Sequence, residues 1–407
     1  MLTVGIDVTN LFWPVSTGVH RYGSGLLEGL SCILDINDVY VAMLDWNVEE
    51  YRGRQVPKNE GFMEYRGAAP LPALNTRAIE APEQMSSLFS RISNKGVHTV
   101  RKLLARYFYH SPDLLKGIDV FHAWHLYPRQ GAARNTVMLH DAYQLLYPDM
   151  FSPTMVARQI KGLEFAKNVA RIVLVPSQYT ADVIADEFGV DNSKIRVVYH
   201  GLSASFRVIK EHAEIQPVLS RYSIFDSPYI LSVGYLDPRK NVVGHLRAFE
   251  SLAKESQFKE LKLVLVGPSD ARTSPILSEI QSSAFRDRVI ITGYVSENEL
   301  PVLYSQAKAF IYCSHYEGFG LPIIEAMACG VPVVTSNRTC LPEVAGKAAT
   351  IVDPDSPTAI TDALAEILMS ATKREHMSQA GLERAAEFTW EKAARNHVAA
   401  YRECYNG

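Results

Sequence analysis

The sequence lacks several features that would point directly to a function. It contains no run of the 18 or so uninterrupted apolar residues that a membrane-spanning helix needs, so no transmembrane segment is expected. Its 41 lysine and arginine residues are balanced by 44 aspartate and glutamate residues, so the chain has no overall positive field to attract nucleic acid. Its five cysteines are scattered and form no C-x-x-C pair, which argues against a disulfide framework and against a zinc site.

Nucleotide-binding and export signatures are missing as well. The first predicted strand is followed by Thr17–Arg21, which fits neither the G-x-G-x-x-G pattern nor the P-loop pattern G-x-x-x-x-G-K-[ST]. A simple dinucleotide or nucleoside-triphosphatase site is therefore not expected. Asp7 interrupts the first apolar stretch, and no charged leader precedes an apolar block. The sequence thus predicts no secretory signal and an intracellular, cytoplasmic protein.

What the chain does contain is a regular alternation of strand-like and helix-like segments. With 407 residues it is long enough for two or three domains. Short β-rich runs recur with helical stretches between them, which predicts α/β domains with parallel sheets and helices on both faces. The predicted strands are 2–7, 39–44, 118–122, 136–140, 171–175 and 195–199 in a first set, and 229–233, 261–266, 288–292, 309–313, 331–335 and 349–352 in a second.

The two sets of strands divide the chain into two α/β domains. We place an N-terminal domain at 1–205 and a C-terminal domain at 206–388, with the irregular, polar segment 203–228 as the linker. A last helix at 389–407, which Thr389 can cap, is expected to pack back on the N-terminal domain.

The strongest local pattern is the nine-residue run from Glu317 to Glu325, which follows an apolar strand. Pro322 suits the first turn of a helix, so we expect Glu317 in the strand-to-helix loop and Glu325 in the first helical turn. Gly318 and Gly320 would let a ligand approach the backbone, and the amides at the helix start favour negative charge. Two carboxylates there suit a ligand with hydroxyls and phosphates. Alternatively, Glu325 only stabilises the helix dipole and Glu317 is a solvated loop residue.

Three further loops carry residues that suit phosphate or sugar binding. Arg239 and Lys240 precede a predicted helix and are placed to hold a diphosphate, although exposed basic pairs are also common in loops. Gly18 follows the first strand and would admit a phosphate to the backbone. His140 ends another predicted strand, where it can donate a hydrogen bond or transfer a proton, or serve as an ordinary structural histidine.

Three other patterns have plainer or open interpretations. The cluster 122–125, with two histidines and a tryptophan, fits either core packing or contact with an acceptor. Asp353 and Asp355 flank a proline and fit a turn better than a metal site. The segment Arg91–His110 has five basic residues, no acidic residue and apolar residues between them. It fits either a helix on an anionic membrane or a packed helix with a solvated basic face.

Together these segments resemble glycosyltransferase family 4, the retaining nucleotide-sugar transferases of the two-domain GT-B fold. The resemblance covers most of the chain and is most specific in the Glu-x7-Glu motif from Glu317 to Glu325. It implies two Rossmann-like domains with a cleft between them. The segments that carry it are 17–18, 139–141, 175–180, 197–201, 234–241, 292–295 and 316–342.

The resemblance also implies roles for individual residues. Glu325 is similar to the carboxylate that binds the nucleotide ribose, and Glu317 to the carboxylate near the donor sugar. Lys240 is similar to the lysine that binds the pyrophosphate, and Gly18 to the glycine whose backbone meets the phosphates. His140 is similar to the histidine near the reacting sugar. We therefore expect His140, Glu317 and Lys240 to take part in catalysis.

Two more positions match the family, and one departs from it. Gly320 and Leu321 correspond to the loop that contacts the donor. Tyr235 stands where many members have an arginine, and we expect Arg239 to take over its role, as in relatives with the same Pro-Arg-Lys-Asn run.

The implied function is transfer of a hexose, with retention, from a nucleoside-diphosphate sugar to a glycan or lipid-linked glycan, as in surface polysaccharide or glycoconjugate synthesis. GDP-mannose is the expected donor, in preference to UDP-sugars, because the run Pro238–Asn241 resembles mannosyltransferase-like members. No metal is implied, since fixed positive charge would stabilise the leaving diphosphate. We expect Arg91–His110 on the acceptor side, in peripheral contact with the inner face of a membrane.

Other functions remain open at this point. A nucleotide-sugar epimerase of similar fold would need no acceptor, and a catalytically silent GT-B subunit would only bind a partner. A retaining glycosidase fits less well, because its two carboxyl groups must flank the scissile bond, whereas Glu325 is expected at the ribose.

Overall fold

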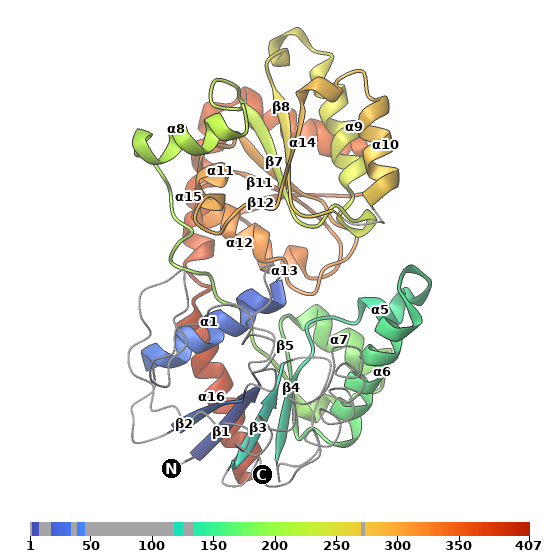
Figure 1. Ribbon diagram of the computed structural model, residues 1–407, viewed down its shortest axis with the longest axis vertical. Coiled ribbons are helices and arrows are strands. Elements are labelled where there is room, and N and C mark those ends of the chain that lie inside the picture. Colours follow the sequence, from blue (N-terminus) through green and yellow to red (C-terminus); the bar gives the residue numbers. More distant parts are fainter. Residues whose placement is uncertain (1, 8–17, 34–38, 45–117, 125–133, 270–272) are drawn as a thin grey trace, which may run out of the picture. The chain divides into compact units, whose positions relative to one another are not determined.

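The computed structural model describes residues 2–7, 18–33, 39–44, 118–124, 134–269 and 273–407 (Figure 1). They form two compact units, the first drawn from residues 1–176, 181–198 and 390–407, and the second from 177–180 and 199–389. The sequence places the divisions after residues 205 and 388, whereas the structure places them after 198 and 389. The segment 91–110, for which membrane contact is expected, lies outside the described residues.

The first unit is built on a parallel sheet of six strands in the order β2-β1-β3-β4-β5-β6. The strand order reverses between β1 and β3, and open parallel sheets bind ligands at the carboxyl ends of their strands, beside such a reversal. The strands are β1 (Leu2–Asp7), β2 (Val39–Leu44), β3 (Val120–Ala123), β4 (Asn135–Met138), β5 (Ile172–Val175) and β6 (Ile195–Val197).

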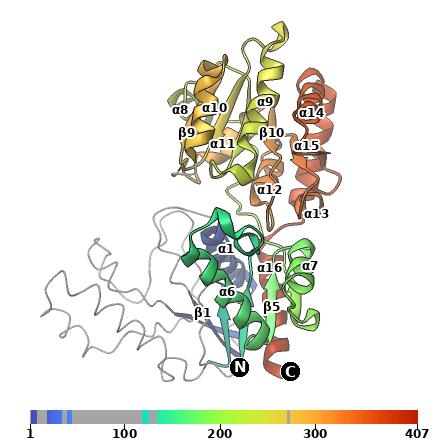
Figure 2. The same cartoon turned by 90° about the vertical axis from the view of Figure 1, so that its right-hand side faces the viewer.

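Helices cover both faces of this sheet (Figure 1). On one face, α1 (Gly18–Ile33) and α16 (Trp390–Asn406) pack on each other over one apolar core. The opposite face, which Figure 2 turns toward the viewer, has a second apolar core. It is covered by α5 (Tyr143–Leu146), the 3-10 turn η2 (Pro148–Met150), α6 (Pro153–Asn168) and α7 (Gln178–Asp186), and a further turn, η3 (Asn192–Lys194), precedes β6.

Glycines on α1 make room for α16. A Cβ atom added to Gly25 would lie 1.9 Å from Cε2 of Trp390, and one added to Gly29 would lie 2.1 Å from the Trp390 carbonyl oxygen. No other residue type fits at such distances, because real side chains do not approach so closely. The last helix therefore packs on the first unit, where the sequence placed it.

A buried chain of hydrogen bonds joins α1 and α16 to the sheet. Nδ1 of His397 donates to the carbonyl of Ala393 at 2.8 Å, so its Nε2 accepts from the Tyr22 hydroxyl, 2.8 Å away. Tyr22 Oη then accepts from Nε2 of His122 at 3.0 Å, and Nδ1 of His122 accepts from Thr136 Oγ1 at 2.9 Å. This assignment of donors and acceptors requires both imidazole rings to be neutral. Burial lowers the pKa of His397 to about 4, and burial together with His397 lowers the pKa of His122 well below its usual range.

The second unit is also built on a parallel six-stranded sheet, in the order β12-β11-β10-β7-β8-β9. Counted from β7, this is the 3-2-1-4-5-6 order of dinucleotide-binding Rossmann sheets, and the reversal lies between β7 and β10. The strands are β7 (Tyr229–Val233), β8 (Lys262–Val266), β9 (Val289–Gly293), β10 (Ala309–Tyr312), β11 (Val333–Ser336) and β12 (Ala349–Val352).

Two layers of helices enclose this sheet over two apolar cores (Figure 1). One layer contains α9 (Val242–Ala253), α10 (Ser274–Ser282) and α14 (Pro357–Met369). The other contains α8 (His212–Arg221), α11 (Leu300–Gln306), α12 (Leu321–Ala328) and α15 (Ala371–Ala385), and α13 (Leu341–Ala345) follows β11. The 3-10 turns are η4 (Pro238–Lys240), η5 (Ser256–Phe258) and η7 (Arg286–Arg288).

The prediction that segment 203–228 is an irregular linker is wrong in one respect, because the segment contains a helix. α8 occupies its centre and belongs to the second unit. Val218 and Leu219 on α8 are buried and Ile215 packs against the same core, so an apolar face stabilises the helix despite Pro217 within it.

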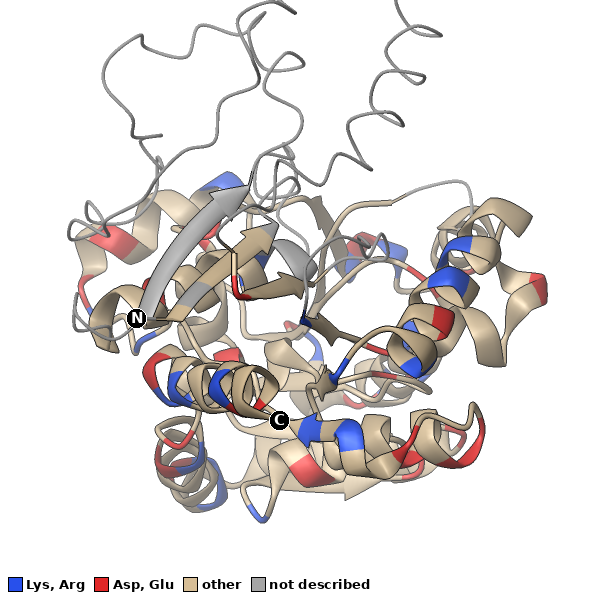
Figure 3. Cartoon of the chain, turned by 90° about the horizontal axis from the view of Figure 1, so that it is seen from below, with Lys and Arg blue, Asp and Glu red and all other residues tan. Residues whose placement is uncertain are grey.

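The sequence expectation of two Rossmann-like units is confirmed. All the predicted strands are present, and β1, β2, β7 and β12 have the predicted bounds. None of the helices in the described ranges is both long and apolar enough to cross a membrane. Acidic and basic residues are interspersed over the described ribbons (Figure 3). On α16, Arg395 pairs with Glu391 at 2.7 Å.

Candidate active site

In the second unit, the loops that follow β7 and β10 meet where the strand order reverses. The two strands are direct neighbours, with Phe310 paired to Leu231. The loop after β7 carries Arg239 and Lys240, and the loop after β10 carries Glu317. These residues are far apart in the sequence, and the topology alone brings them to the edge of the sheet where such folds bind ligands.

Arg239 and Lys240 lie on the turn η4, between β7 and α9. Asp237 caps this turn, because its Oδ1 accepts from the backbone N–H of Arg239 and its carbonyl accepts from that of Lys240, both at 2.9 Å. Pro238 fixes φ at the first position of the turn. The carbonyl of Arg239 accepts from the N–H of His315 at 2.9 Å, which ties the turn to the loop after β10.

The carboxylate of Glu317 lies between these two cations. Its Oε1 is 2.5 Å from Nζ of Lys240, and its Oε2 is 2.8 Å from Nη1 of Arg239. The Glu317 side chain is only 8% exposed and that of Lys240 12%, so this is an ion pair largely removed from water. The interpretation of Glu317 as a solvated loop residue is therefore wrong.

Charge and burial oppose each other at Glu317. Burial alone would raise the pKa of its carboxyl group, but Arg239 and Lys240 outweigh burial and lower that pKa to about 2. Burial also lowers the pKa of the Lys240 ammonium, against the attraction of Glu317. Glu317 is therefore ionised at neutral pH, and the three side chains together carry a surplus of one positive charge when both cations are protonated.

Several residues that the sequence did not single out complete this arrangement. The Lys240 ammonium donates to Tyr312 Oη at 2.6 Å and lies 4.8 Å from the centre of the Tyr312 ring. The backbone N–H of Glu317 donates to Thr339 Oγ1 at 3.2 Å, and Sγ of Cys340 donates to the Glu317 carbonyl at 3.2 Å. Tyr312 ends the strand directly before this loop, and that position in the sequence was the signal that could have identified it. Thr339 and Cys340 come from beyond the next strand.

Gly320 and Leu321 form the start of α12. Gly320 has a φ of +96°, which glycine adopts without the penalty of a side chain, and an added Cβ would lie 2.8 Å from Cδ2 of Leu341. Leu321 is the first helical residue, and Gly330 follows the helix with a φ of +74°, a conformation that glycine adopts readily at helix ends.

Glu325 does not lie in the first turn of this helix, contrary to the sequence-based expectation. Because α12 begins at Leu321, Glu325 is one turn further along, and it is 1% exposed. Its Oε2 accepts from the hydroxyl of Tyr304 at 3.0 Å. The role of Glu325 at the nucleotide ribose stays a prediction.

Gly18 and His140 belong to the first unit, whereas the other predicted site residues belong to the second. Gly18 is the first residue of α1, which follows β1. His140 follows β4, and its Nε2 donates to the carbonyl of Trp124 at 3.2 Å. Its ring packs edge-on against Tyr22 with the ring centres 4.8 Å apart.

Two open interpretations are resolved by the packing. His122 and Trp124 are fully buried, so core packing accounts for both, and His125 lies outside the described residues. Asp353 forms a turn, because its Oδ1 accepts from the N–H of Asp355 at 3.1 Å, and both carboxylates pair with Arg338. Among the described residues, no group of three or more side chains of metal-binding type comes together.

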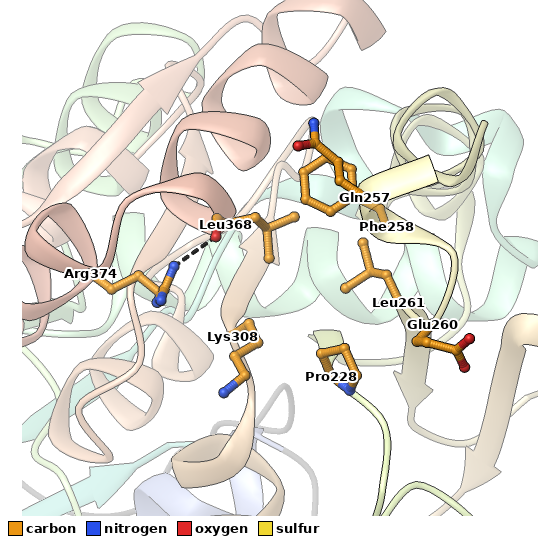
Figure 4. A pocket seen from close by; sticks show the side chains of 8 residues that line it. All are labelled: Pro228, Gln257, Phe258, Glu260, Leu261, Lys308, Leu368 and Arg374. Carbon is orange, nitrogen blue, oxygen red and sulfur yellow. Dashed lines mark hydrogen bonds between the residues drawn. The ribbon is translucent and has the colours of Figure 1, made fainter. Parts of the chain in front are cut away.

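A hollow on the second unit lies at the opposite edge of its sheet (Figure 4). Pro228, Leu261 and Lys308, which line it, directly precede β7, β8 and β10. On one side of the hollow, Arg374 Nη1 donates to the carbonyl of Leu368 at 2.7 Å. The hollow is thus at the amino ends of the strands, where parallel sheets do not hold their ligands.

Comparison with known proteins identifies the family. Residues 222–384 match the protein family described as "Glycosyl transferases group 1", and residues 63–206 match the family described as "Glycosyltransferase Family 4". O-antigen chain mannosyltransferase B of Escherichia coli is 31% identical over 283 residues, which are 70% of this chain and 74% of that protein. The chain belongs to glycosyltransferase family 4.

Other relatives agree with this assignment. The serotype-specific mannosyltransferase WbdA of Escherichia coli is 28% identical over 271 residues, so the match covers 65% of this chain but only 33% of WbdA. Sucrose-phosphate synthase from Thermosynechococcus elongatus has the same fold, with a TM-score of 0.70 at 21% identity over 99% of both chains. The fold is GT-B. As a family 4 glycosyltransferase, the protein is a retaining hexosyltransferase that uses a nucleotide-sugar donor and a glycan acceptor.

Proposed function

We propose that this family 4 glycosyltransferase transfers mannose from GDP-mannose to a glycan or lipid-linked glycan during synthesis of a surface polysaccharide. The observation that carries the proposal is the fixed pair of cations, Arg239 and Lys240, held against the buried carboxylate of Glu317 at the reversal of a Rossmann-like sheet. Arginine and lysine in adjacent positions suit the oxygens of a diphosphate. The names of two relatives, an O-antigen chain mannosyltransferase and a serotype-specific mannosyltransferase, support the sugar and the product class.

Each site residue has a role in this proposal. Arg239 and Lys240 bind the donor diphosphate, and Glu317, which both cations contact, receives hydroxyl groups of the donor sugar. Gly320 and Leu321 contact the donor, because the glycine lets a ligand approach the backbone at the start of α12.

Three residues complete the site in our proposal. Glu325 binds the nucleotide ribose. From the first unit, Gly18 offers its backbone N–H to the phosphates, and His140 lies near the reacting sugar.

The chemistry follows from the charges. When the bond between the sugar carbon and the phosphate oxygen breaks, the leaving diphosphate gains negative charge and the sugar becomes oxocarbenium-like. Arg239 and Lys240 stabilise the first of these charges without having to move, because they are already fixed in place. Glu317 stays ionised and offers negative charge to the sugar. The proposal includes no metal ion, since the two cations and the start of α12 supply the compensating charge.

We also propose that segment 91–110 serves the acceptor side and contacts an anionic membrane. Its five basic residues would each gain about 1 kcal/mol near an anionic surface. Co-sedimentation with anionic and neutral vesicles tests this. We expect salt-sensitive binding to the anionic vesicles, weakened by the double substitution Arg101→Glu and Lys102→Glu. Wild-type protein that stays in the supernatant at low salt would contradict membrane contact and favour a soluble acceptor.

A donor screen tests the central proposal. The full chain is incubated with GDP-, UDP-, ADP- and dTDP-sugars, and release of the nucleoside diphosphate is followed by chromatography. We expect turnover with GDP-mannose and little turnover with the glucose derivatives of the four nucleotides. Turnover with a UDP-sugar alone would contradict the choice of donor, and release from none of them would contradict transferase activity.

A further inference from the structure

The residue that follows the two cations has an unusual conformation. Asn241 lies between η4 and α9 with φ 56° and ψ 36°, the left-handed region that asparagine tolerates better than most residues. Its side-chain amide is buried, and Nδ2 donates to two carbonyls, that of Cys313 at 3.2 Å and that of Pro354 at 2.8 Å. These carbonyls follow β10 and β12. One amide group thus connects the end of the cationic turn to the loops after two other strands.

His245 strengthens this connection from the next turn of α9. Its Nε2 accepts from the N–H of Cys313 at 3.1 Å, so Nδ1 carries the proton and donates to Ser232 Oγ at 3.2 Å. Burial lowers the pKa of His245 to about 3, which keeps the ring in the neutral form that this bond needs. Asn241 and His245 together bind both the C=O and the N–H of Cys313.

Gly244 provides the space for the Asn241 amide. A Cβ atom added there would lie 2.3 Å from Oδ1 and 2.6 Å from Nδ2 of Asn241. The helical backbone at this position does not otherwise require glycine, and glycine inside a helix costs about 1 kcal/mol relative to alanine. Gly244 is therefore explained by the side chain that it accommodates.

We propose that Asn241 is a positioning residue that holds Arg239 and Lys240 in place for the donor diphosphate. The inference rests on the proposed function of that pair. Two like charges on adjacent residues of a three-residue turn repel each other. Glu317 opposes this repulsion at the side chains, and anchors at the two ends of the turn hold its backbone. Asp237 fixes the start of the turn, and the Asn241 amide fixes its end. When that anchor is lost, part of the donor's binding free energy is used to restore the conformation of the turn, and the donor binds more weakly.

Three variants of the full chain test the proposal: Asn241→Gly, Gly244→Ala and the double variant. Glycine keeps the left-handed backbone and removes only the amide, whereas Gly244→Ala displaces the amide while keeping it in the chain. The dissociation constants of GDP and UDP are measured by calorimetry, and donor KM and kcat by the release assay.

We expect each single variant to bind the preferred nucleotide about tenfold more weakly and to raise donor KM by a similar factor. The value of kcat should change less than about twofold, because saturating donor restores the turn. In the double variant the second change should have no further effect, since the clash with the amide is gone.

The alternative outcomes are distinguishable. Wild-type affinity in Asn241→Gly, or additive losses in the double variant, would show that the amide is structural only, and either result overturns the proposal. Melting temperatures measured in parallel separate a folding defect from a loss of nucleotide binding. A wild-type chain that binds neither GDP nor UDP would overturn the proposed function, and this inference with it.

Discussion

The Nζ atom of Lys240 lies 2.5 Å from Oε1 of Glu317, although 77 residues separate them in the chain. The pair stands at the carboxyl edge of the second sheet, where a donor diphosphate would meet the same ammonium group. The contact therefore sets the charge of the site before a donor binds. In our proposal, the donor diphosphate competes with Glu317 for the Lys240 ammonium or shares it.

Replacement of Lys240 by alanine should weaken donor use strongly. Losing a charged hydrogen bond costs about 1.5–3 kcal/mol, which corresponds to a rise in donor KM or a fall in kcat/KM of roughly 10- to 100-fold. Lys254→Ala, at an exposed position just after α9, is the matched control and should leave donor kinetics unchanged. Unaltered kinetics in a folded Lys240→Ala variant would contradict the assignment of this lysine.

Glu317→Gln should separate nucleotide binding from turnover. Removing the negative charge leaves Arg239 and Lys240 without their internal counter-charge, so GDP should bind at least roughly fivefold more tightly. Turnover should fall by about 100-fold or more, because the charge offered to the reacting sugar is lost. Calorimetry with GDP and the release assay measure the two effects, and Glu279→Gln on the exposed side of α10 is the control. Weaker GDP binding would mean that the carboxylate helps to hold the nucleotide.

Acid should destabilise the first unit through its buried histidines. The pKa of His397 is about 4 when folded and about 6.5 when unfolded, so the unfolded chain binds more protons between these values. Its contribution is complete above pH 6.5 and is lost as the pH falls toward 4, which amounts to on the order of 3 kcal/mol. Urea denaturation at several pH values should show a shallower dependence for His397→Gln and an unchanged one for His376→Gln, which is exposed. Equal slopes for wild type and His397→Gln would refute this.

Gly29→Ala should disrupt the contact between α1 and α16. The new Cβ would lie 2.1 Å from the backbone oxygen of Trp390, which cannot move aside as a side chain would. Overpacking of this kind costs about 1–3 kcal/mol or more, and the free energy of unfolding should fall by at least that amount. Cys32→Ala, on the exposed face of the same helix, should be close to neutral. Equal stability of the two variants would mean that α16 shifts without cost.

Activity should survive treatment with EDTA followed by desalting. The proposed charge compensation comes from Arg239, Lys240 and the start of α12, none of which a chelator removes. The release assay is repeated with Mg²⁺ or Mn²⁺ added back, and we expect no stimulation beyond that of ionic strength. A strict requirement for either cation would contradict the proposal and direct attention to Asp353 and Asp355.

The sequence predicts the strands of both units well, and the site only in part. The apolar run 229–233 is bounded by Pro228 and Gly234, and a strand follows from that pattern alone. Nothing local shows that β10 lies beside β7 rather than β9, and that pairing is what joins Glu317 to Arg239. Both residues could therefore be named from the sequence, but their contact could not be predicted from it.

Two errors have local causes that the sequence hides. α8 was missed because Pro217 interrupts its pattern, yet its buried face stabilises the helix. Glu325 was expected one turn too early, because the position of Pro322 does not fix which residue starts the helix, whereas the left-handed Gly320 does. By contrast, the asparagine that follows two basic residues, with a glycine three residues later, was a pattern in the sequence that could have indicated the buried Asn241 amide beside Gly244.

The packing of α16 has a consequence for synthesis on the ribosome. Residues 390–407 supply Trp390, His397 and Tyr401 to the core of the first unit, yet the second unit precedes them in the chain. Domains generally fold in the order in which they emerge, but here the apolar surface that α16 covers stays exposed until the later unit has been translated. The first unit would thus be open to chaperone binding while residues 199–389 are made.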